Sequence, residues 1–107
     1  MSKKIYCIAS FKAKDGKEQE LLEVLKALEP NTTREDGCIQ YTVTKKIDNP
    51  YATGTSMPIV FNEIWASKED FENHCNKPYI TNFFQTQCVD EDGLVENFNV
   101  CVYTDEV

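Results

Sequence analysis

Glu63, Trp65 and His74 are the side chains best suited to chemistry, and they lie within one short stretch. His74 is the only histidine of the chain, and an imidazole is the natural proton acceptor at neutral pH. Trp65 is the only tryptophan and ends an apolar, strand-like run. The pair indicates a base beside an aromatic wall. The alternatives are a His74 bonded to a carboxylate or solvated on a helix, and a Trp65 that is simply a large core residue.

Glu63 shares a strand face with Phe61 and Trp65 if the strand is regular. A carboxylate between aromatic rings needs a partner, and His74 or Arg34 is expected to provide it. Structural pairing is favoured over a role in binding. Asn62 is also a candidate for substrate binding, but it points to the opposite face if the strand is regular, which favours a polar contact at the dimer side over a place in the pocket.

Further candidates for a binding pocket are aromatic. The phenols of Tyr41 and Tyr79 are suited to orienting a substrate, and Phe83 and Phe84 to forming a wall. Each of these residue types is more often part of a core.

The sequence predicts neither a metal nor a cofactor. One histidine and scattered carboxylates give no metal-ligand spacing. The four glycines are isolated turn residues, so no phosphate-binding loop is present. Five cysteines without a Cys-x-x-Cys pair indicate small packed side chains rather than disulfides or a zinc site.

Charge and length limit the binding partners, the number of domains and the location that we expect. Eleven basic against eighteen acidic residues give a net charge of −7, which disfavours nucleic acid and anionic membranes. The 107 residues suffice for one domain, expected to span 1–107. No apolar run is long enough to span a bilayer, and the N-terminus does not read as a signal peptide, so the cytoplasm is the expected compartment.

The elements that must position these residues alternate between strand and helix. Period-two patterns predict strands at 5–13, 38–47, 59–65 and 94–103. Capping boxes at Asp15 and Ser67 predict the starts of two helices, and Pro30 is expected to interrupt or kink the first. Pro78 precedes a further helix over 79–87. A long connection fills 48–58.

The resulting order, β-α-β-β-α-β, predicts the ferredoxin-like α+β fold, an antiparallel sheet with helices on one face. In Ile59-Val60-Phe61 the apolar residues point both ways, although helices cover only one face. A second copy of the sheet is the simplest cover. We therefore expect a homodimer.

Several segments resemble the antibiotic biosynthesis monooxygenase family, including its branch of small quinol monooxygenases. The similarity covers roughly residues 5–87 and is carried by Ala13-Lys14-Asp15-Gly16-Lys17, Glu35-Asp36-Gly37-Cys38-Ile39-Gln40-Tyr41, Asn62-Glu63-Ile64-Trp65, and Ser67, Glu69, Phe71, His74 and Lys77-Pro78-Tyr79.

The resemblance implies a dimeric α/β barrel with a pocket between sheet and helices in each subunit. It also implies oxidation of a small phenol or quinol by O2 without metal or flavin. Trp65, Glu63 and His74 occupy family positions, with His74 as base or hydrogen-bond partner and Trp65 at the pocket border.

The sequence also departs from its relatives. Tyr79 replaces a second histidine that is common after the helical proline, which weakens a two-histidine proton relay. The haem-degrading branch has Asn, Trp and His where this chain has Ala9, His74 and Phe84, so haem oxygenation is not expected.

Two other functions stay open: a non-catalytic dimeric binding or stress protein, and an isomerase of a small sugar-like ligand. A cavity of a few hundred Å³ with His74 at its wall would favour the oxygenase. A collapsed pocket would favour the binding protein, and a polar, basic pocket the isomerase.

Overall fold

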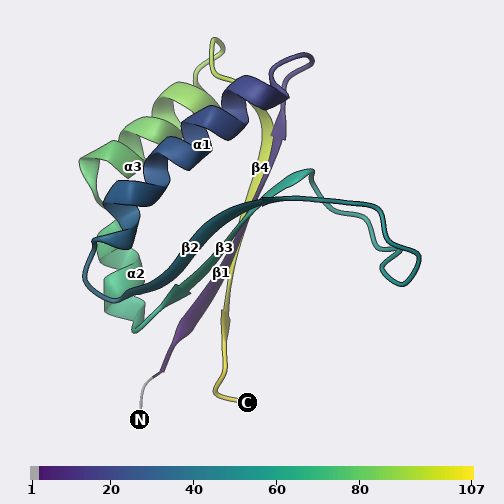
Figure 1. The fold of residues 1–107 in the computed structure, drawn as a ribbon. Helices are drawn as coiled ribbons and strands as arrows, with labels where there is room; N and C mark the ends of the chain where they lie inside the picture. Colours follow the sequence, from purple (N-terminus) through teal and green to yellow (C-terminus); the bar gives the residue numbers. More distant parts are fainter. Residues whose placement is uncertain (1–2) are drawn as a thin grey trace.

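A single antiparallel sheet organises the chain, whose computed structural model describes residues 3–107 (Figure 1). The four strands lie in the order β2-β3-β1-β4. They are β1 (Ile5–Ala13), β2 (Cys38–Lys45), β3 (Ile59–Trp65) and β4 (Val95–Thr104). The helices are α1 (Glu18–Thr33), α2 (Lys68–Cys75), α3 (Pro78–Phe83) and the π-helix η1 (Phe84–Val89). This is the ferredoxin-like topology expected from the order of the elements.

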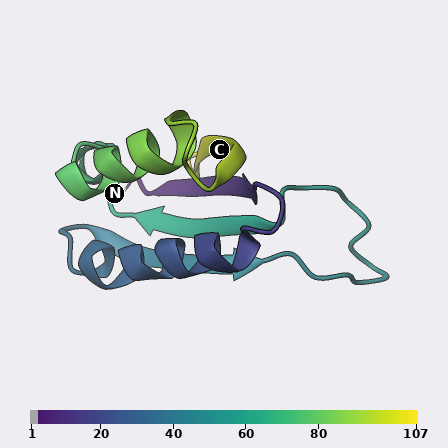
Figure 2. The same cartoon turned by 90° about the horizontal axis from the view of Figure 1, so that it is seen from above.

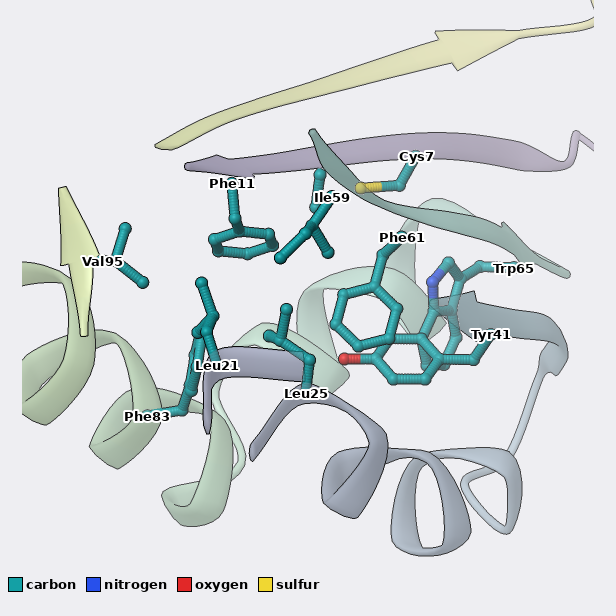
Figure 3. Packing of buried hydrophobic residues seen from close by; sticks show 11 residues of the cluster. Cys7, Phe11, Leu21, Leu25, Tyr41, Ile59, Phe61, Trp65, Phe83 and Val95 are labelled. Atoms are coloured by element: carbon teal, nitrogen blue, oxygen red, sulfur yellow. The ribbon is translucent and has the colours of Figure 1, made fainter. Parts of the chain in front are cut away.

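All helices lie on one side of the sheet (Figures 1 and 2). The core between the two layers is formed by alternate residues of the strands and the inner face of α1, as Figure 3 shows for Phe11, Phe61 and Leu25. Each of these three side chains is at most 2% exposed. Burial of such apolar surface is the main favourable term in folding.

The start of α1 differs from the expected capping box. The helix begins at Glu18, and no side chain caps it. Gly16 has a φ of +75°, and the amide of Lys17 donates to the carbonyl of Lys14 at 2.9 Å. Asp15 is therefore part of a tight turn and lies too far ahead of the helix to cap it.

Pro30 does not end α1, because the helix continues to Thr33. The burial of Leu21, Leu25 and Thr32 against the sheet outweighs the backbone hydrogen bond that the proline removes.

The predicted cap of the second helix is confirmed, since Oγ of Ser67 accepts from the amide of Asp70 at 3.1 Å. The helix expected over 79–87 instead divides into α3 and the wider η1. Gly93 packs so closely on the backbone of Gln87 that a side chain there would overlap it. The side chain of Gln87 also accepts from the amide of Leu94 at 3.0 Å. These tertiary contacts accompany the change of helix type.

No helix covers the opposite face of the sheet, although residues 55–58 lie close to its Ser10 end. It is named here the open face, and alternation in the strand register places on it Tyr6, Ile8, Ser10, Lys12, Gln40, Thr42, Thr44, Val60, Asn62, Ile64, Asn97, Asn99, Cys101 and Tyr103. From the same side of the sheet, residues 46–58 project as a long arm between β2 and β3 (Figures 1 and 2). Among residues 3–107, no helix is long and apolar enough to cross a bilayer.

Gly37 provides a test of this architecture. Its φ is +78°, and an added methyl group would overlap the carboxylate of Asp70 at the start of α2. We expect Gly37→Ala to lower the free energy of unfolding by about 3 kcal/mol, through backbone strain and overpacking together. Urea unfolding followed by circular dichroism measures the change.

Two matched variants separate the causes. Gly16→Ala has the same positive φ but open space, and should cost about 1 kcal/mol. Gly54→Ala has neither strain nor a neighbour within 4 Å and should leave stability unchanged. Equal losses for Gly37 and Gly16 would rule out the packing contribution at α2.

Candidate active site

A cavity of about 140 Å³ lies between the sheet and the helices α1, α2, α3 and η1. Its lining is apolar apart from the two thiols, Cys7 and Cys75, and three more polar side chains, Tyr41, Glu63 and His74. The volume is smaller than the few hundred Å³ that we expected for an oxygenase. No lysine or arginine contributes to the wall, which is not the basic pocket that a sugar isomerase would need.

His74 reaches this wall from α2, the helix that Ser67 caps. The side chain is only 4% exposed, and Nδ1 lies 2.9 Å from Oε2 of Glu35. Because a carboxylate only accepts, Nδ1 carries the proton of this hydrogen bond, and Nε2 is left with its lone pair. Burial lowers the pKa of His74, while the contact with Glu35 partly opposes that shift. The imidazole is therefore neutral at pH 7 and able to accept a proton.

Glu35 receives a second hydrogen bond, from the hydroxyl of Tyr79 on α3. That hydroxyl also lies 3.0 Å from Oγ1 of Thr32 at the end of α1. Burial raises the pKa of Tyr79 to about 12, so the phenol keeps its proton and stays a donor. Tyr79 is not in the cavity wall. It holds the carboxylate that in turn orients His74.

Glu63 lies on the cavity side of β3, with Oε1 accepting from Nε1 of Trp65 at 2.9 Å. Cys7 on β1 is the residue paired with Glu63 across the two strands. Burial raises the pKa of Glu63 to about 7, and the hydrogen bond from Trp65 moderates the rise. The expected partners, His74 and Arg34, are wrong for Glu63: strand alternation puts Trp65 on the same face two residues later, while Glu35 takes His74.

Trp65 is fully buried and lies behind the cavity wall rather than in it. Its ring packs against that of His74 with centroids 4.6 Å apart at 34°. The tryptophan therefore supports two polar side chains of the wall, His74 by ring packing and Glu63 by its indole N–H.

The remaining predicted residues divide between the two faces. Tyr41, Phe83 and Phe84 line the cavity, and Tyr41 stacks on Phe61 with centroids 4.3 Å apart. Burial raises the pKa of Tyr41, which stays a neutral phenol. Asn62 is on the open face, where its amide donates to Thr44 Oγ1 at 3.0 Å. It cannot touch a ligand in this cavity.

Glu35 was not predicted as a functional residue. The segment Glu35-Asp36-Gly37-Cys38 marks a turn in the sequence, and His74 lies 39 residues further on. The signals available were that turn and the general expectation that a buried histidine bonds a carboxylate.

The chemistry available here is proton transfer within an apolar space. Over residues 3–107, no three histidine, cysteine or acidic side chains are grouped to hold a metal ion. Burial raises the pKa of Cys75 to about 11 and that of Cys7 further, so both thiols of the wall stay protonated and weakly nucleophilic. A neutral imidazole and a carboxyl group with a raised pKa are thus the proton-exchanging groups of the cavity.

The carboxyl group of Glu63 has a testable effect on stability. Its pKa rises from 4.5 to about 7 on folding, so between these values the folded chain keeps a proton that the unfolded chain releases. This stabilisation is complete below pH 4.5 and is lost as the pH rises through about 7. We expect Glu63→Gln to match the wild type near pH 4.5 and to exceed its free energy of unfolding by on the order of 2–3 kcal/mol at pH 8.

Urea unfolding of both proteins across this pH range measures the difference in the free energy of unfolding. Both proteins contain His74, so its titration contributes equally to both curves and cancels in the difference. A constant difference at all pH values would contradict the raised pKa.

The fold and sequence place the chain among known proteins. A solved structure from Shewanella oneidensis is 35% identical, with a TM-score of 0.80 over 97% of this chain and 92% of that chain. A Pseudomonas aeruginosa structure is 23% identical, with a TM-score of 0.76 over 97% and 95%. A dabb family protein with a ferredoxin-like fold from Mesorhizobium loti is 16% identical, with a TM-score of 0.73 over 94% and 95%.

A comparison with curated proteins found no match. The family model described as antibiotic biosynthesis monooxygenase matches residues 4–86, which include the Glu35–His74 pair and Glu63. With most of its length matched, this chain belongs to the antibiotic biosynthesis monooxygenase family.

Proposed function

We propose that the protein is a cofactor-independent monooxygenase that oxidises a small phenol or quinol with O2 inside the cavity between sheet and helices. The observation that carries this proposal is the neutral His74, buried at an apolar wall and oriented by Glu35. Membership of the family supports both the reaction class and a phenol or quinol as the substrate class, and the apolar wall with a proton acceptor suits such a substrate.

In the proposed reaction, Nε2 of His74 accepts the phenolic proton. The imidazolium that forms is stabilised by the carboxylate of Glu35, 2.9 Å from Nδ1. The apolar wall keeps water away from the phenolate and so preserves its reducing power. The phenolate then passes one electron to O2, and the phenoxyl radical and superoxide combine at a ring carbon.

The second half of the reaction releases water. The resulting peroxide takes the proton from His74. A base then removes the hydrogen at the oxygenated ring carbon as a proton, and the electron pair of that C–H bond forms the second carbonyl as the O–O bond breaks. The leaving hydroxide takes the proton back from the base and becomes water. A quinone and one water molecule leave, so that a phenol and O2 are balanced by a quinone and water. Glu63, the other proton-exchanging group of the wall, is suited to serve as that base.

The main alternative is a binding protein that has kept the fold without the chemistry. The modest cavity volume favours it, whereas the oriented histidine favours the enzyme. The cytoplasmic location stays a prediction from the sequence.

Oxygen uptake with a panel of reduced quinones and phenols tests the enzyme. We expect His74→Ala to lower the rate by roughly a hundredfold or more, because the general base is lost. Asn73→Ala, an exposed neighbour on the same helix, is the control and should keep the wild-type rate. Circular dichroism verifies that each variant is folded. Equal rates for the wild type and His74→Ala would exclude His74 as the base and favour the binding protein.

We also propose that two copies associate through the open face. Among the strand residues of this face only Lys12, near the end of β1, carries a charge, although 27% of the chain is charged. A solvated sheet face ordinarily carries charged side chains, and the centre of a protein interface is depleted of them. Two-fold pairing would place equivalent uncharged strands against each other.

Sedimentation equilibrium tests this association. The wild type should have twice the 12.3 kDa mass of the chain at micromolar concentration. Ile8→Lys places a charge at the centre of the open face and should shift the protein toward the monomer, because the charge would be desolvated. Val89→Lys, at an exposed apolar position on η1, is the control and should remain dimeric. A monomeric wild type would refute the pairing.

A further inference from the structure

The smallest side chain of the cavity wall, Ala9, lies in the sheet. Ala9 lies on the helix-covered face of β1, paired with Phe61 on β3 and Val100 on β4. Its neighbours on the same face of β1 are the larger Cys7 and Phe11. All five residues line the cavity. Ala9 therefore leaves more space above the sheet than Cys7 or Phe11 does, and we call it the floor of the cavity, where a ligand would lie against the sheet.

The strand register gives the cavity two chemically different ends. Glu63 pairs with Cys7, which is the residue next to Ala9 on the same face of β1. Glu63 forms the polar end of the cavity together with His74. Phe11 lies one step from Ala9 in the other direction. Phe83 and Phe84 pack on Phe11 with ring centroids 5.8 and 6.4 Å away, and close the apolar end.

The volume limits the guest. A cavity of about 150 Å³ lined by Leu, Ile and Phe is sufficient to bind benzene, whereas drug-sized ligands occupy roughly 300–1,000 Å³. The cavity here measures about 140 Å³, which fits one aromatic ring. A second fused ring would have to displace Phe84 or extend past Val100, which is 41% exposed.

We propose that the site selects single-ring phenols, with the ring over Ala9, the hydroxyl group at Glu63 and His74, and the ring edge against the phenylalanines. This rests on the proposed function and names its substrate class. Ala9 and Phe84 are the residues that set the size limit: one provides the floor, and the other closes the end where a larger substrate would need space.

Binding without turnover tests the size limit separately from the chemistry. Titration calorimetry under nitrogen compares phenol with 1-naphthol, which adds one fused ring and keeps the hydroxyl group. The wild type should bind phenol at least about tenfold more tightly than 1-naphthol. Ala9→Leu fills the floor and should weaken phenol binding by a similar factor. Phe84→Ala opens the apolar end and should improve 1-naphthol binding at least about tenfold.

The two variants predict opposite changes, so a variant that fails to fold leaves the other as a test. Wild-type binding of 1-naphthol as tight as that of phenol, or no binding of phenol at all, overturns the size limit. Unchanged phenol binding in a folded Ala9→Leu overturns the assignment of the floor. Oxygen uptake with phenol is measured separately in air. Phenol that binds as predicted but consumes no O2 supports the size limit and refutes the proposed oxidation.

Discussion

The contact between Glu35 and His74 holds the candidate active site together. The carboxylate follows α1, the imidazole is on α2, and the hydroxyl of Tyr79 on α3 donates to the same oxygen, Oε2. One acceptor atom thus ties three helical segments over the sheet. A buried carboxylate with two donors is compensated for lost hydration, whereas removal of either donor would leave it with fewer partners. The orientation of His74 is therefore a property of the packed helices and not of α2 alone.

Burial shifts the pKa values of the two polar groups in opposite directions. It lowers the pKa of His74 and raises that of Glu63 to about 7, since a buried site disfavours the charged form of each. His74 is thereby neutral at pH 7, and Glu63 exchanges its proton near that pH, although the whole chain carries a net charge of −7. The neutral imidazole suits an apolar ligand, and a phenolate formed there would be attracted to the new imidazolium.

Local patterns predicted the framework, and long-range packing decided the rest. Alternation predicted β1 and β3 with their observed ends, and Ser67 was identified as a cap because its partner is three residues away. The prediction that Asp15 caps α1 was wrong, because Gly16 with its positive φ forms a tight turn between Asp15 and the helix. The role of Glu35 could not be predicted, because it depends on a contact across 39 residues. The cavity volume was equally hidden, since it depends on what the helices place above Ala9.

Strand alternation assigns the two faces of one sheet to different tasks. On β3, Glu63 faces the cavity, whereas its neighbours Asn62 and Ile64 lie on the open face that we propose for dimerisation. A slip of one residue in the pairing would exchange these sets, bringing Glu63 into the interface and Asn62 into the cavity. Any contact that fixes the strand register on one face therefore also fixes which residues lie on the other face. This coupling explains how a chain of 107 residues could hold both the proposed reaction site and the proposed interface: the two share one sheet and use opposite faces of the same strands.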